Sequence, residues 1–261
     1  HDLRRSALLC CVISALSLSP CAAKTKNAPS NPKIQNTQMS VEVNSSDGSY
    51  SIRDSQGDSF TARMGAKING QWIFSTDYPQ HHTTTSSFTD ELGSGDAVTI
   101  VHSGRAESPN LSLSFKLYSN PGYARIAAEV KNVNRQPINI QAIRLIDGRG
   151  NSLINLGGPD AANRILSDSF SEDRPAVAIH ELFSIEGGQH RGVGSQLIYN
   201  RQSKHSMFVG ALSSDKFLTI LRLRVDPAQK KLAGFEVESA GTTELAKENS
   251  LRDSAPEDQI E

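Results

Sequence analysis

The segment NLSLSFKLYS (residues 110–119) alternates strictly between apolar and polar side chains. Leu111, Leu113, Phe115 and Leu117 occupy every second position, and serines, a lysine and a tyrosine stand between and after them. Successive side chains of a β-strand point to opposite faces of the sheet, so this pattern predicts a strand with one face in the core. The segment therefore sets the expected fold class.

The same two-residue period recurs on both sides of this segment. It is found in SYSIRDS (49–55), SFTARMG (59–65), QWIFS (71–75), AVTIVHS (97–103), YARIAAEVKN (123–132), INIQAIRLID (138–147), SMFVGAL (206–212), FLTILRLRVD (217–226) and GFEVES (234–239). Turn-forming combinations such as SSDG (45–48) and DPAQ (226–229) separate the segments. Roughly ten strands at short spacing predict an all-β fold, a large antiparallel β-sandwich (super-sandwich) with little helix. A bulge is expected where the apolar phase slips between Ala142 and Ile143, and a short helix in PDAANRIL (159–166).

The first residues have a different composition. Arg4 and Arg5 precede the apolar run SALLCCVISALSLS (6–19), and small side chains follow in PCAAK (20–24). This order predicts a secretory signal peptide over residues 1–23, because the apolar run is shorter than the roughly 20 residues that span a bilayer. The protein is therefore expected to be exported to the periplasm or the extracellular space. In an alternative interpretation Cys21 is lipidated, and that lipid anchor would be the only membrane contact.

Composition divides the rest of the chain in two. Residues 24–40 are rich in Asn, Lys and Pro and predict a disordered linker, whereas the sandwich is expected over residues 41–261, with its last strand cut at EDQIE (257–261). All 3 cysteines lie within the first 21 residues, so the sandwich has no internal disulfide and no thiolate metal site. A formal net charge of −1 gives no electrostatic reason to expect nucleic acid as a partner.

Most standard catalytic sequence motifs are missing, and we expect no cofactor and no metal. His81 and His82 are adjacent, so their side chains should diverge, and we interpret them as solvated loop histidines. The segment SDSFSEDRP (167–175) gathers ionisable side chains, namely Asp168, Glu172, Asp173 and Arg174. Catalytic carboxylate pairs of glycosidases stand roughly 5 Å or more apart on different elements, which consecutive residues of one turn cannot supply. We expect an ordered turn with an arginine–carboxylate contact, or a substrate or interface rim, and no catalytic residue.

Two further features allow alternative interpretations. Trp72, the only tryptophan of the chain, lies in an alternating segment. We interpret it as an aromatic residue of the core or of an interface, or alternatively as a platform for sugar stacking. In LRLR (221–224) the leucines face inward, so Arg222 and Arg224 share the opposite face. That face is interpreted as solvated, or alternatively as an interdomain or sugar-binding surface.

Several ordered motifs resemble the N-terminal β-sandwich domain of secreted α-galactosidases related to plant raffinose and stachyose synthases. They are STDYPQ (75–80), LYSNPGYARIAAEVKN (117–132), ILSDSFSEDRP (165–175) and the segment from GGQHRGVGSQLIYN to LRLR (187–224). The resemblance runs from roughly residue 45 to the end. It implies a following TIM barrel with two catalytic aspartates, which hydrolyses terminal α-galactosyl linkages with retention. No catalytic residue can be carried over to this chain.

The resemblance implies a non-catalytic supporting domain, inactive alone, whose partners are an α-galactoside oligosaccharide and its own C-terminal barrel. Trp72, Asp168, Glu172, Asp173 and Arg174 are the rim residues expected from it. The alternative is a free-standing carbohydrate-binding sandwich that captures galactosides without cleaving them. A third interpretation is a structural envelope domain without a ligand.

Overall fold

The computed structural model describes residues 31–120, 122–149, 153–168, 177–184, 188–213 and 217–241. The predicted signal peptide, Cys21, Glu172, Asp173, Arg174 and the C-terminal segment EDQIE lie outside the described residues. No helix in the described ranges has the length and apolar character needed to cross a membrane.

The predicted all-β fold is confirmed. Within the described ranges the regular elements are antiparallel strands together with the short 3-10 helices η1 (Ser75–Asp77) and η2 (Asp160–Ala162). The strands of the first half are β1 (Lys33–Gln35), β2 (Met39–Val43), β3 (Tyr50–Asp54), β4 (Ser59–Ile68), β5 (Gln71–Phe74), β6 (Gln80–Asp90), β7 (Gly93–Ser103), β8 (Asn110–Tyr118) and β9 (Ala124–Lys131). The strands of the second half are β10 (Ile140–Arg149), β11 (Ile154–Asn155), β12 (Asn163–Asp168), β13 (Val177–Glu181), β14 (Gln189–Val193), β15 (Ser195–Asn200), β16 (Ser206–Gly210), β17 (Leu218–Asp226) and β18 (Lys231–Ala240).

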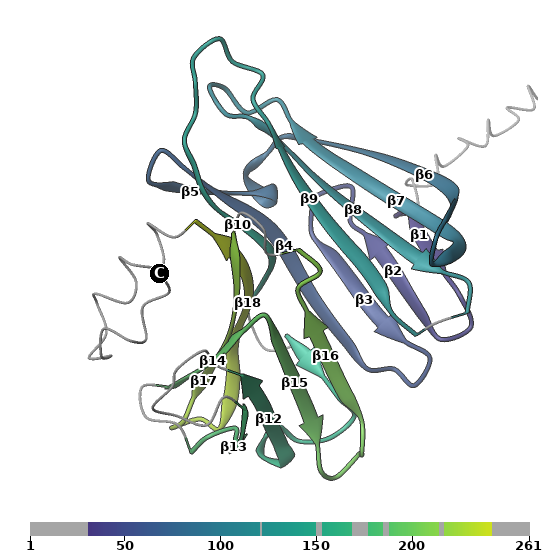
Figure 1. The fold of residues 1–261 in the computed structure, drawn as a ribbon, viewed down its shortest axis with the longest axis vertical. Coiled ribbons are helices and arrows are strands. Elements are labelled where there is room, and N and C mark those ends of the chain that lie inside the picture. The colour runs from purple at the N-terminus through teal and green to yellow at the C-terminus, as the bar shows by residue number, and fades with distance from the viewer. Residues whose placement is uncertain are drawn as a thin grey trace, which may run out of the picture. The chain divides into compact units, whose positions relative to one another are not determined.

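The strands form one large sheet and two smaller ones. The large sheet has 10 strands and runs β1-β2-β3-β4-β10-β18-β17-β14, with β5 and β11 also paired to β4. The 4-stranded sheets run β6-β7-β8-β9 and β13-β12-β15-β16. β4 joins the two halves of the large sheet, because its first residues pair with β3 and the rest with β10 and β5 (Figure 1).

Each small sheet packs on one half of the large sheet. Strands β7 and β8 contact β1, β2 and β4, and strands β12 and β15 contact β14 and β17. In β8 the predicted face is buried: Leu111, Leu113, Phe115 and Leu117 are each at most 2% exposed. Tyr50 of β3 packs on Phe115 with ring centroids 4.8 Å apart. The alternation of residues 110–119 thus places one side of β8 in the core of a sandwich, as expected.

Four local predictions need correction. β1 lies within residues 24–40, so strand structure begins inside the predicted linker. The helix expected after Pro159 is limited to η2, because β12 pairs with both β13 and β15. The expected bulge in β10 lies on either side of the predicted position, with register shifts between Ile140 and Ala142 and again after Arg144. His81 lies in strand β6, not in a loop, and its Nδ1 is 2.9 Å from Nδ1 of His102.

Candidate functional site

The candidate site is a row of charged residues on the large sheet, on the face opposite to the core. Directly opposed residues of five adjacent strands form this charged row, in the order Arg63, Asp147, Glu236, Arg222 and Arg191. Leu221, Leu223, Phe235 and Val237 of the same strands point into the hydrophobic core. The two-residue period of β17 and β18 therefore creates the row, since it separates the arginines and glutamates from the apolar side chains.

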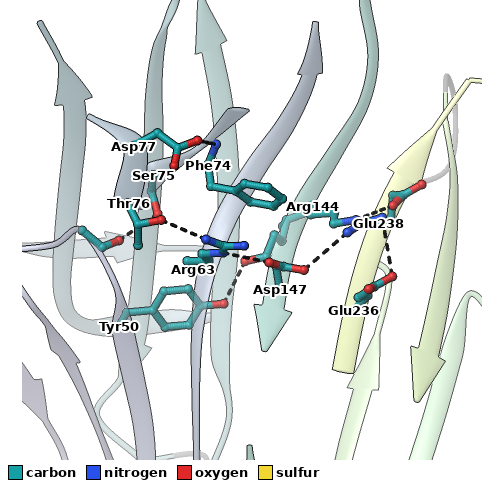
Figure 2. Close-up of polar contacts among 12 residues, drawn as sticks. Tyr50, Arg63, Phe74, Ser75, Thr76, Asp77, Arg144, Asp147, Glu236 and Glu238 are labelled. Carbon is teal, nitrogen blue, oxygen red and sulfur yellow. Dashed lines mark hydrogen bonds and ion pairs between the residues drawn. The ribbon is translucent and has the colours of Figure 1, made fainter. Parts of the chain in front are cut away.

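Arg144 neutralises the acidic part of the row. Asp147 and Glu236 are opposite each other, and two carboxylates in such positions repel. The guanidinium of Arg144 lies between them, 3.4 Å from Asp147 and 3.5 Å from Glu236, and its Nε donates to Glu238 at 2.5 Å (Figure 2). The side chains of Asp147 and Glu236 are 0% exposed. Burial of these charges is possible because each one has an oppositely charged partner.

The ion pairs of Arg144 with Asp147, Glu236 and Glu238 form the centre of a charged network, and each end of this network has further partners. Arg63 donates from Nε to Asp147 at 2.9 Å and from a terminal nitrogen to the hydroxyl of Thr76 at 3.0 Å. Arg222 lies 3.4 Å from Glu238, and Arg224 donates to Glu236 at 3.2 Å. The network thus connects β4, β10, β17 and β18, which belong to both halves of the large sheet.

Trp72 and Phe74 cover part of the network. Their rings are stacked with centroids 5.9 Å apart; the guanidinium of Arg144 lies 4.0 Å from the Trp72 ring and that of Arg63 lies 3.7 Å from the Phe74 ring. Both contacts are cation–π interactions. Gly65 makes this cover possible, since a Cβ at this position would stand 2.8 Å from the Phe74 ring and 3.4 Å from that of Trp72.

We expect Gly65→Val to displace the aromatic cover and to lower the free energy of unfolding by about 1–3 kcal/mol, as overpacking of a filled site does. Urea unfolding measures the loss of stability. The fluorescence emission reports the displacement, because Trp72 is the only tryptophan of the chain. Gly241→Val is the control for the loss of a glycine: like Gly65 it has no positive φ, and a Cβ there would lie 3.8 Å from the Phe217 ring, an ordinary van der Waals distance. Unchanged emission in Gly65→Val would contradict the proposed contact.

A small open depression adjoins the network at Arg63. It measures about 270 Å³ and is lined by Ser49, Thr61, Ala62, Arg63, Thr76 and Asp147. Hydroxyls, a guanidinium and a carboxylate there offer both donors and acceptors to a small polar ligand. The three carboxylates of the network, Asp147, Glu236 and Glu238, are each held by arginines. No group of three or more His, Cys, Asp or Glu suited to a metal ion occurs within the described ranges.

Of the five expected rim residues, the structure describes Trp72 and Asp168. Trp72 is half-buried and lies on the charged network, with additional contacts to Ala142, Ile220 and Ala240. Asp168 is the last residue of β12, where its backbone pairs with Val177. Glu172, Asp173 and Arg174 belong to the part of the chain that the structure leaves undescribed, so their predicted contacts stay predictions.

Sequence reasoning missed Arg63, Arg144, Asp147, Glu236 and Glu238. The signal for the glutamates was present in GFEVES, where they alternate with Phe235 and Val237. The interpretation of Arg222 as solvated is wrong, because this residue is 4% exposed and is paired with Glu238. Long side chains of opposite charge on adjacent strands bury one another. The sequence of a single strand does not reveal such a pairing.

No known protein-family model matches the chain, and neither does any curated protein. The resemblance to α-galactosidases consequently rests on the sequence motifs alone.

Proposed function

We propose that this β-sandwich is a non-catalytic domain of an exported glycoside hydrolase that removes terminal α-galactosyl residues from galacto-oligosaccharides. In this role the sandwich supports a catalytic barrel and helps to shape its entrance. The supporting observation is the charged row with its aromatic cover. A face that carries buried charges, a half-buried tryptophan and an open polar depression offers both shape and polar groups to a barrel surface or to sugar hydroxyls.

The exposure of the network supports a contact role. The side chains of Arg63 and Arg224 are 30% and 43% exposed, although their carboxylate partners Asp147 and Glu236 are 0% exposed. The outer arginines can therefore donate to a further acceptor while their partners fix their positions.

The alternative, a free-standing galactoside-binding sandwich, is favoured by the depression beside Arg63. A pocket of about 270 Å³ with a carboxylate, a guanidinium and hydroxyls can take a monosaccharide unit. In this case the chain itself binds galactosides and no barrel is needed.

The two functions predict different activities. The gene product extended by any coding sequence after Glu261 should hydrolyse p-nitrophenyl α-galactoside, whereas the 261-residue chain should not. If the extended product is inactive on α-galactosides, or if no coding sequence follows, the proposed enzyme role is wrong.

Binding by the chain itself is tested with raffinose and melibiose. Both sugars should change the emission of Trp72 with a dissociation constant in the millimolar range, which corresponds to a binding free energy of about −4 kcal/mol. Sucrose lacks the α-galactosyl unit and should cause no change. Calorimetry should show about tenfold weaker binding for Trp72→Ala and near-normal binding for Trp72→Phe, which retains an aromatic ring. Equal responses to raffinose and sucrose would contradict recognition of the galactosyl unit.

A further inference from the structure

The outer face of the β6–β9 sheet carries a row of aromatic rings. Phe88 of β6 and Tyr118 of β8 stand on either side of Gly95, and their rings meet across it with centroids 5.0 Å apart. Tyr123 extends the row, 5.4 Å from Tyr118. Gly95 is required here, because a Cβ would lie 2.1 Å from the carbonyl oxygen of Leu117. Tyr118 is 1% exposed and Tyr123 is 43% exposed, so the row ends in an accessible ring.

Two cations lie beside this row around one carboxylate. Oδ2 of Asp90 accepts from Lys116 at 3.0 Å and from the hydroxyl of Tyr118 at 3.0 Å, and it lies 3.8 Å from Arg125. The hydrogen bond from Lys116 is the main cause that lowers the pKa of Asp90, which keeps the central charge in place. The side chains of Lys116 and Arg125 are both 40% exposed. Three side chains thus contribute two positive charges and one negative charge.

The strands beside the cluster present small side chains, several of them with hydroxyls. The strand next to Lys116 presents Ala97 and Thr99, and Thr99 shares a hydrogen bond of 2.8 Å with Ser114. Ser86 and Thr84 continue these two rows on β6 and are exposed.

We propose that the cluster of Phe88, Asp90, Lys116, Tyr118, Tyr123 and Arg125 binds an acidic saccharide with uronic acid units. The apolar face of a pyranose ring packs on the exposed ring of Tyr123. Its carboxylate accepts hydrogen bonds from Lys116 and Arg125. Its hydroxyls can form hydrogen bonds with Asp90, Thr99 and Ser114, which lie on the same face of the sheet. Charge selects an acidic sugar over a neutral one, because the cations outnumber the carboxylate they surround. This surface differs from the charged row at Trp72, and the proposal does not rest on the function proposed above.

Calorimetric titration of the full chain with trigalacturonate tests this proposal, with galactotriose as the neutral probe and acetate as the anion-only probe. Trigalacturonate should bind with a submillimolar dissociation constant, and raising the salt concentration should weaken binding. Lys116→Met and Tyr123→Ala should each weaken binding about tenfold, which corresponds to about 1.4 kcal/mol. Tyr123→Phe keeps the ring and should bind within twofold of the original chain.

Lys131→Met is the matched control. It removes the same charge from the end of β9, six residues beyond Arg125 and about 20 Å away along the strand. Binding in this variant should stay within twofold. The proposal is wrong if Lys131→Met weakens binding as much as Lys116→Met does, if galactotriose or acetate binds as tightly as trigalacturonate, or if no binding is seen at 10 mM, a concentration about tenfold above the expected range. Trp72 emission separates this surface from the galactoside site. Binding of trigalacturonate to the cluster should leave the emission unchanged, because Trp72 is not part of the cluster.

Discussion

Replacing Asp147 with alanine should lower the free energy of unfolding by about 3–5 kcal/mol, the range measured when one partner of a buried ion pair is removed. The side chain of Asp147 is 0% exposed and lies between Arg63 and Arg144 (Figure 2). Its loss leaves two guanidinium groups short of an acceptor in a site closed by Trp72 and Phe74. Arg144 is 12% exposed and cannot recover its hydration without moving the aromatic cover.

Urea unfolding of the full chain measures this loss. Asp147→Asn keeps the shape and an acceptor oxygen but not the charge, so it should lose less than Asp147→Ala. Glu129→Ala removes an exposed carboxylate from β9 and should change the free energy of unfolding by less than about 0.5 kcal/mol. The buried network would be refuted by equal losses in Asp147→Ala and Glu129→Ala.

A double-mutant cycle separates the pair from the general effect of truncation. Arg63→Met removes the cation that Asp147 holds at 2.9 Å. If the two residues act through their contact, the double variant should be more stable than the sum of the single losses indicates, because it leaves no unpaired charge between these positions. Additive losses would show that Asp147 stabilises the sheet through its other partners.

The fold class was predictable because the strands of this core carry a local signal. In β8 every second residue is apolar, and the buried face follows directly from that period. β6 carries no such signal: QHHTTTSSFTD is mostly polar and mostly exposed, and its strand structure comes from pairing with β7 along its whole length. Tertiary pairing, not local preference, forms such a strand.

The candidate site was not predictable to the same degree, because its members are distant in the chain. Arg63 and Asp147 are 84 positions apart and meet only through the register of β4 and β10. The register shift after Arg144 also matters, since it allows Arg144 and Asp147 to reach the same group of carboxylates and arginines. Alternation shows which face a side chain occupies, but neither strand order nor register can be read from a single strand.

Acidification from pH 7 to pH 5 should destabilise the fold by about 2 kcal/mol through His102 alone. His102 is 0% exposed, and burial, followed by the nearby His81, lowers its pKa to about 3. In the unfolded chain the same side chain titrates near pH 6.5. Between these two values the unfolded state binds more protons, so stability is complete above about pH 6.5 and falls by up to 1.4 kcal/mol per pH unit as the pH decreases.

The surroundings of His102 explain why it stays neutral. Its Nδ1 lies 2.9 Å from Nδ1 of His81, so one neutral imidazole donates to the other and a second proton has no place between them. Tyr78 packs against its ring, and a Cβ at Gly48 would stand only 2.9 Å from its Nδ1. Burial lowers the pKa of His81 more than the nearby Asp47 raises it, so the neutral form of this histidine is favoured as well.

Chemical denaturation at pH 5, 6 and 7 separates His102 from the other acid-sensitive groups. Unfolded carboxyl groups titrate near pH 4 and contribute little above pH 5, whereas His190, whose pKa is also lowered by burial, adds a loss of the same sign. His102→Asn keeps a hydrogen-bonding group near Nδ1 but binds no proton, so its stability should depend less steeply on pH. His82→Ala, an exposed neighbour of His81 in β6, should retain the original slope. If His102→Asn and His82→Ala have the same slope as the original chain, the acid sensitivity does not come from the buried histidine pair.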